Sequence, residues 1–174
     1  MKKWMIEVFG PYLIDKATKG NPIPQNIKSF IWKDWEEEGC PKDMLKKVGC
    51  YVFGIRTAQG AIRPYYVGKA TKGFGKEIFT ADKLLKYNNS VLLKKYGTPV
   101  MFLIAHPLQK GKNNIRLIEE LEYCLIGLAY KKNPEGLQNV HGVYDDKWQL
   151  EGFGKKGKTP KKVKDFARML NLKH

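Results

Sequence analysis

The sequence predicts a single α+β domain, and three observations support this class. Two β-rich runs, CYVFGIRT at 50–57 and RPYYVGKA at 63–70, flank the segment AQGA and are typical of a β-hairpin. A continuous apolar run, PVMFLIAH at 99–106, has the length of a central strand. Segments with helical periodicity precede, separate and follow these strands. With 174 residues, 43% of them hydrophobic, the chain can bury a core beneath such helices.

The first predicted element is a helix that begins at Asn26, where IKSFIWKDWEEEG repeats apolar residues at helical spacing, and ends at Gly39. Residues 1–25 are mixed in composition, and Gly10-Pro11 marks a break there. After the hairpin, EIFTADKLLKYNNSVLLKKYG predicts a second helix that is interrupted at Asn88-Asn89.

The third predicted helix follows the central strand and contains IEELEYCLIGLA at 118–129. Its apolar stripe consists of Ile115, Ile118, Leu121, Leu125 and Leu128. Glu122 lies near this stripe, about 70° from its centre, where a carboxylate must be paired, bound to a metal or protonated. We expect the helix to end before Asn133-Pro134, because proline disfavours helix in the preceding residue.

The C-terminal segment GFGKKGKTPKKVKDFARMLNLKH predicts a Gly/Lys linker and a short helix, with Thr159 as its cap and Pro160 at its first position. Part of this linker, GFGKKGKT at 152–159, satisfies the P-loop pattern. A P-loop requires a buried strand before it and a nucleotide-binding sheet around it. Neither is predicted here, so a basic linker that can contact phosphates is the better interpretation.

Charge is the strongest global signal, because 32 Lys and Arg residues against 17 Asp and Glu residues give a net charge of +15. Such a balance favours a polyanionic partner, most often nucleic acid. A solubility surface without a partner is the alternative. No secretion signal or membrane span is predicted. The three cysteines, Cys40, Cys50 and Cys124, form no disulfide or zinc pattern and fit a reducing cytoplasm.

Two tripeptides lie on the predicted hairpin: Gly49-Cys50-Tyr51 opens its first strand, and Tyr66-Val67-Gly68 lies in its second. Glu122 then begins the pattern E-x-x-L-I on the third helix, and Asn139 follows in LQN. In this order, over residues 48–140, the motifs resemble the GIY-YIG nuclease family. The resemblance implies a small three-stranded antiparallel sheet flanked by helices. It also implies an endonuclease that hydrolyses phosphodiester bonds with a divalent metal, on DNA rather than RNA.

The resemblance further implies roles for individual residues. Glu122 matches the family's ligand for Mg²⁺ or Mn²⁺, and one hard carboxylate suffices for Mg²⁺, which keeps several waters. An ordinary ion pair is the alternative role for Glu122. Tyr51 and Tyr66 match the paired tyrosines that position or deprotonate water, and strand packing is the alternative role for both. Since a free tyrosine titrates at about 10, a cation is needed nearby, and Lys69 is the natural one. Gly68 lets backbone or substrate approach closely.

The chain departs from the family pattern at two positions. Lys76 stands where the family usually has a phosphate-binding arginine, so the charge is kept but the bidentate fork is lost. Thr80 stands where many members have His or Tyr. Arg63, His106 and Arg116 are candidates to compensate for these changes.

We therefore expect an N-terminal extension with a helix at 1–47, a nuclease-like core at 48–140, and a basic linker and helix at 141–174. Glu122 should face the side of the sheet that carries Tyr51 and Tyr66, whereas a position on the opposite side, in a surface ion pair with a lysine, would argue against a metal site. The C-terminal helix should contact DNA, or dock on the core by its apolar face, or do both. A DNA-binding module that has lost catalysis is the alternative function, and Lys76 and Thr80 favour it.

Overall fold

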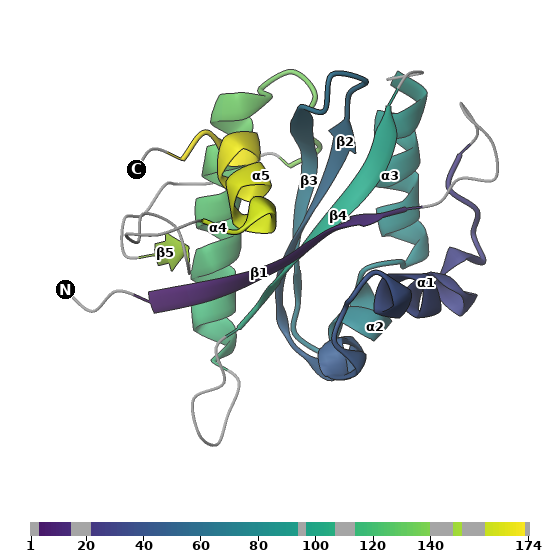
Figure 1. Ribbon diagram of the computed structural model, residues 1–174, viewed down its shortest axis with the longest axis horizontal. Helices are drawn as coiled ribbons and strands as arrows, with labels where there is room; N and C mark the ends of the chain where they lie inside the picture. The colour runs from purple at the N-terminus through teal and green to yellow at the C-terminus, as the bar shows by residue number, and fades with distance from the viewer. Residues whose placement is uncertain are drawn as a thin grey trace.

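The computed structural model describes residues 4–14, 22–93, 97–106, 114–139, 148–150 and 159–172. Its centre is a sheet in the order β3-β2-β4-β1-β5 (Figure 1). The strands are β1 (Trp4–Leu13), β2 (Gly49–Arg56), β3 (Ile62–Ala70), β4 (Thr98–Ala105) and β5 (Trp148–Leu150). The first four form an antiparallel sheet, and β5 pairs in parallel with β1. The expected α+β class is therefore confirmed.

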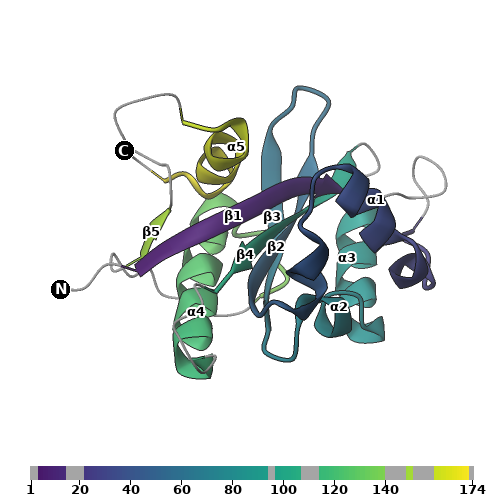
Figure 2. The same cartoon turned by 60° about the horizontal axis from the view of Figure 1, so that its bottom comes forward.

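Helices cover both faces of the sheet (Figures 1 and 2). A separate hydrophobic core lies between each helical layer and the sheet. One layer contains the 3-10 turns η1 (Ile27–Ser29) and η2 (Lys42–Lys46) with the helices α1 (Ile31–Glu37), α2 (Phe74–Glu77) and α3 (Ala81–Leu93). The other layer contains α4 (Ile115–Lys132) and α5 (Lys161–Leu170). Because side chains alternate along a strand, Tyr51 and Phe53 of β2 face the first layer, and Cys50 and Val52 face the second.

The sheet is larger than the three strands that the family resemblance implies, because residues 4–13 add β1 to the edge of β4. Gly10-Pro11 does not end this strand but shifts its register between Phe9 and Tyr12. Gly10 has a φ of +98°, and a Cβ atom there would lie 2.6 Å from the carbonyl oxygen of Met101. Glycine therefore lets β1 bend while it stays close to β4.

The predicted hairpin, central strand and long helix are confirmed as β2–β3, β4 and α4. The predicted break at Asn88-Asn89 is wrong, because α3 continues through both residues. The Asn88 side chain instead pairs with the backbone of Ile23, at 2.7 Å to its nitrogen and 3.1 Å to its oxygen. Pro160, not Thr159, is the N-cap of α5, so the predicted start of that helix is one residue too early.

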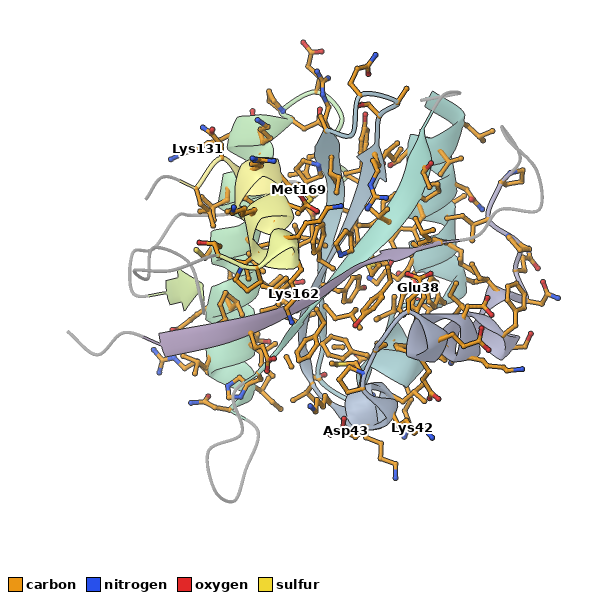
Figure 3. All side chains as sticks on the ribbon, viewed as in Figure 1. Glu38, Lys42, Asp43, Lys131, Lys162 and Met169 are labelled. Atoms are coloured by element: carbon orange, nitrogen blue, oxygen red, sulfur yellow. The ribbon has the colours of Figure 1, made fainter. Side chains whose placement is uncertain are left out.

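The basic helix α5 docks on the core by its apolar face. Its buried side chains are Val163, Phe166, Ala167, Met169 and Leu170. The ring of Phe166 lies edge-on to Phe102 of β4, with the two ring centroids 5.2 Å apart. Lys162 lies beside β1, with its Nζ 4.8 Å from the ring centroid of Phe9 (Figure 3). Docking by the apolar face is thus confirmed, whereas the linker at 151–158 lies outside the described residues.

Cys40, Cys50 and Cys124 are buried free thiols. In the described part of the chain, no helix combines the length and the apolar character needed to cross a membrane.

Candidate functional site at strand β3

The GCY and YVG tripeptides lie side by side on β2 and β3, with Tyr51 opposite Gly68 and Cys50 opposite Lys69. A Cβ atom on Gly68 would overlap the ring of Tyr51, so glycine is required for this ring to pack across β3. On the other face, the thiol of Cys50 donates to the carbonyl oxygen of Ile118 in α4 at 3.3 Å. The first motif therefore contacts both the second motif and the helix that carries the predicted metal ligand.

Lys69 lies between two carboxylates of α4. Its Nζ is 3.1 Å from Oε1 of Glu119 and 3.3 Å from Oε2 of Glu122. Both carboxylates reach the same ammonium because residues three apart share one side of a helix. The side chains of Glu122 and Lys69 are 16% and 36% exposed. The three residues form a half-buried charged cluster on the outermost strand of the sheet, which we call the Lys69 cluster.

The Lys69 cluster has one ammonium between two carboxylates. Partial burial acts to lower the pKa of Lys69, but its contacts with Glu119 and Glu122 outweigh burial, and the pKa is raised. The ammonium is therefore charged at neutral pH. Burial raises the pKa of the neighbouring Cys50 thiol well above its usual range, and the charge of Glu122 adds to this shift. That thiol stays protonated and acts as a packed side chain.

Asn139 binds the exposed edge of β3. Its Oδ1 accepts a hydrogen bond from the backbone nitrogen of Val67 at 2.7 Å, and its Nδ2 donates to the oxygen of the same residue at 2.8 Å. The side chain of Asn133 donates a hydrogen bond to the carbonyl oxygen of Pro64 at 2.8 Å. The backbone nitrogen of Gln138 donates to the carbonyl oxygen of Tyr65, also at 2.8 Å. The segment after α4 thus satisfies backbone groups that an edge strand leaves unpaired.

Tyr51, Tyr66 and Tyr87 form an aromatic cluster on the face covered by α3. The ring centroids of Tyr51 and Tyr66 are 6.2 Å apart, and those of Tyr66 and Tyr87 are 5.9 Å apart. Tyr51 and Tyr87 are fully buried, and burial raises the pKa of each well above its ordinary value. The Tyr51 hydroxyl approaches that of Tyr87 without reaching hydrogen-bond geometry. Tyr51 is therefore a neutral core residue.

The expectation that Glu122 faces the same side of the sheet as Tyr51 and Tyr66 is wrong. Side chains alternate along β3, so Lys69, three residues after Tyr66, points to the opposite face. The buried side chains of α4 belong to the core on that opposite face. The predicted site residues therefore divide between two sides of one strand, with the tyrosines on one side and the Lys69 cluster on the other.

Lys69 is also not the cation beside the tyrosine rings. Lys83 and Lys86 of α3 take this place, with their Nζ atoms 5.3 and 4.9 Å from the ring centroid of Tyr66. Burial acts to lower the pKa of Lys83, but its contacts with Tyr66 and Asp82 outweigh burial and raise it. The sequence does not indicate these lysines, because only tertiary packing brings α3 against β3.

The two positions that depart from the family pattern lie near α2 and α3. Lys76 is exposed on α2. Its neighbour Glu77 accepts a hydrogen bond from the backbone nitrogen of Lys72. The hydroxyl of Thr80 donates to Oδ1 of Asp82 at 2.6 Å, at the start of α3. Thr80 therefore belongs to the beginning of a helix.

The three candidates to compensate for these departures are dispersed. Arg63 lines a pocket between the β2–β3 hairpin and α5. Nε of Arg116 pairs with Glu120 at 3.3 Å, one turn along α4. His106 is buried at the end of β4, where its backbone nitrogen donates to the carbonyl oxygen of Val48 at 2.9 Å.

Glu119 and Glu122 fit a hard divalent cation. Their contacts with one ammonium show that oxygens of both side chains converge on a position that already holds a positive charge. Mg²⁺ is commonly bound by one or two carboxylates together with waters and substrate phosphate. A cage of three or more His, Cys, Asp or Glu side chains is absent from the described residues. The two carboxylates therefore suit Mg²⁺ or Mn²⁺ that keeps waters among its ligands. They do not form a site in which protein side chains supply every ligand.

Glu119 is the residue of this group that sequence reasoning missed, although its spacing of three from Glu122 could have indicated it. Comparison of the chain with known protein families, with curated proteins and with solved structures finds no match.

Proposed function

We propose that this protein is a metal-dependent endonuclease of the GIY-YIG type that hydrolyses phosphodiester bonds of DNA. The observation that carries the proposal is the convergence of four separate motifs on one stretch of β3, from Tyr66 to Lys69. GCY pairs with this stretch, Asn139 binds its backbone at Val67, and Glu122 contacts its lysine. These residues are spread over about half of the chain.

The Lys69 cluster supplies the groups that phosphodiester hydrolysis requires. Glu119 and Glu122 would hold Mg²⁺ or Mn²⁺, which when bound supplies Lewis acidity and lowers the pKa of water. Lys69 would leave its position between the two carboxylates when a cation binds there, and its ammonium could then stabilise negative charge on a phosphate oxygen. The proposal gives Tyr51 no proton-transfer role, because its hydroxyl is buried and its pKa is raised.

A second candidate function is DNA binding without hydrolysis. Two observations favour it: Lys69 already forms ion pairs with both carboxylates, and the hydroxyl of Tyr51 lies on the other side of β3. In that case Glu122 is an ion-pair residue that fixes α4 against β3.

Glu122→Gln tests the proposal. The amide keeps the shape of the side chain and loses the charge that a divalent cation requires, so we expect at least a ~100-fold loss of metal-dependent nicking. DNA affinity should stay within about twofold, because lysines elsewhere provide it. The assay is nicking of supercoiled and branched DNA with and without Mg²⁺ or Mn²⁺, together with equilibrium binding to the same DNA.

Glu120→Gln is the matched control, because it removes the same charge from the same helix outside the Lys69 cluster. It should retain full activity. Metal-independent cleavage, or full activity in Glu122→Gln, would overturn the proposal. DNA binding by all three proteins without any cleavage would establish the second candidate.

A further inference from the structure

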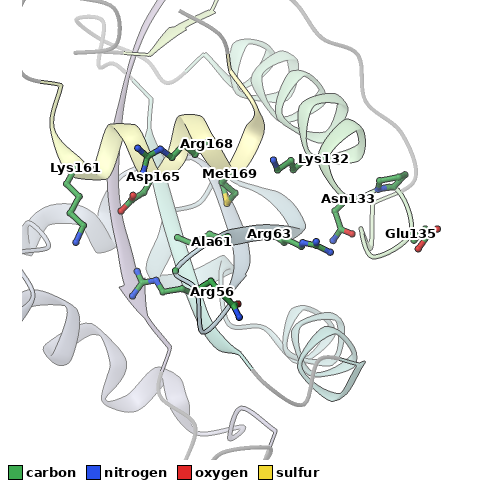
Figure 4. A pocket seen from close by; sticks show the side chains of 14 residues that line it. Arg56, Ala61, Arg63, Lys132, Asn133, Glu135, Lys161, Asp165, Arg168 and Met169 are labelled. Atoms are coloured by element: carbon green, nitrogen blue, oxygen red, sulfur yellow. The ribbon is translucent and has the colours of Figure 1, made fainter.

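A large basic pocket lies at the other end of β3, away from the Lys69 cluster. It has a volume of about 920 Å³ and lies between the β2–β3 hairpin, the C-terminal end of α4 and helix α5 (Figure 4). Its charged lining residues are Arg56, Arg63, Lys132, Lys161, Arg168, Glu135 and Asp165. Figure 4 shows cations on several sides of the pocket, with Met169 of α5 pointing toward the hairpin.

The charges of this pocket are unbalanced. Five cations against two carboxylates leave three net positive charges. No ion pair joins any of the five cations to a carboxylate within the part of the chain that the structure describes. Like charges held together in a concave surface repel one another, and an anion in that surface relieves the repulsion. The pocket is therefore built for an anionic ligand, and its three arginines suit phosphate oxygens.

The pocket and the Lys69 cluster lie on the same side of the sheet, because α4 contributes to both and α5 packs in the same layer as α4. Six residues of strand separate Arg63 from Lys69, which corresponds to about 20 Å. Ten residues of α4 separate Glu122 from Lys132, which corresponds to about 15 Å. Along B-DNA, these lengths span roughly four to six base pairs.

We infer that this pocket binds the sugar–phosphate backbone of duplex DNA roughly four to six base pairs from the phosphate that is cleaved at the Lys69 cluster. The distance to the cleaved phosphate rests on the proposed nuclease function, whereas backbone binding does not. The exposed side chains of Ala61 and Pro134 lie among the cations and provide apolar contact area for deoxyribose. The pocket fixes the position of the DNA on the protein and does not contribute to sequence specificity.

The double variant Arg63→Gln/Arg168→Gln tests backbone binding, since both side chains are exposed and their loss removes no core contact. Its affinity for a labelled duplex of ~20 base pairs is measured between about 50 and 200 mM salt. We expect the slope of log affinity against log salt to fall by about two units, because two phosphate contacts are lost. Lys28→Gln/Lys33→Gln, on the opposite helical layer, is the charge-matched control and should keep the wild-type slope.

Equal slopes for the pocket variant and the control variant would overturn the inference. So would tight binding of inorganic pyrophosphate to the wild-type protein with no slope change in the pocket variant, because the pocket would then be a small-anion site. Interference by phosphate ethylation locates the contact, which should lie roughly four to six base pairs from the nick. A protein that shows the slope change but never nicks DNA would refute the proposed function and support the inference on backbone binding.

Discussion

The ionisable side chains on the two sides of strand β3 are in opposite states. On the α3 face, Tyr51 and Tyr87 are fully buried, and their pKa values are raised well above the ordinary range. On the α4 face, Lys69 is paired with two carboxylates and stays charged, with about a third of its side chain exposed. The two sides of β3 therefore have contrasting electrostatic environments.

This contrast shows where the chemistry of the motif can take place. A buried phenol without a hydrogen-bonded partner strongly resists ionisation, so the aromatic face supplies packing and rigidity. A half-buried pair of carboxylates with an ammonium holds fixed charge close to solvent, where a cation and a phosphate can enter. Under the proposed nuclease function, we therefore assign the catalytic charges to the α4 face and the positioning of β3 to the aromatic face.

Two substitutions, Gly68→Ala and Tyr51→Phe, test this division of roles by their effect on protein stability. Gly68→Ala should have the larger effect. The added methyl group overlaps the Tyr51 ring, so the strand and the ring must move apart. We expect the free energy of unfolding to fall by about 1–3 kcal/mol, measured by urea denaturation.

A double-mutant cycle isolates the cause of this loss. Tyr51→Leu makes room above β3, so Gly68→Ala should cost less in that background than in the wild type. An equal cost in both backgrounds would show that Tyr51 does not set the requirement for glycine.

Tyr51→Phe should have the smaller effect. Its hydroxyl is buried without a hydrogen bond, so removal should leave the free energy of unfolding unchanged or raise it by up to about 1 kcal/mol at neutral pH. The pKa of folded Tyr51 is raised, whereas that of the unfolded chain is about 10. The contribution of Tyr51 to the free energy of unfolding is therefore fully present below pH ~10. It is lost as the pH rises above ~10, because Tyr51 then releases its proton first in the unfolded state. Tyr51→Phe should lose less stability than the wild type over that alkaline range.

Tyr123→Phe, on an exposed ring of α4, is the control for stability at neutral pH. DNA nicking by Tyr51→Phe tests whether Tyr51 has a role in catalysis as well as in packing. Wild-type nicking would agree with a packing role, whereas loss of nicking with unchanged stability would give Tyr51 a direct role in catalysis.

Much of the fold was predictable, because it is encoded locally. The hairpin, β4 and α4 follow from alternation, apolar runs and the proline after α4. Strand β1 escaped prediction because Gly10-Pro11 is a break signal in sequence terms, whereas in the fold it makes a bulge against Met101. The continuity of α3 at Asn88 depends on a contact with Ile23, which is 65 residues away in the chain.

The candidate site was predictable in its members but not in its arrangement. Sequence order identified Lys69, Glu122 and Asn139, which the structure brings to one stretch of β3. The period of two along a strand already implied that Tyr66 and Lys69 face opposite sides. The face covered by α4 could not be deduced from the helix alone, and the basic pocket forms only when α5 docks beside the hairpin.

The most direct test of the central claim is paramagnetic broadening of backbone amide signals by Mn²⁺ in the isotope-labelled protein. We predict that the signals of Lys69, Glu119 and Glu122 broaden first and that Glu122→Gln abolishes this selectivity. Broadening centred on Tyr66 and Lys83, or unselective broadening that is identical in the wild type and in Glu122→Gln, would contradict the assignment of the metal chemistry to the α4 face.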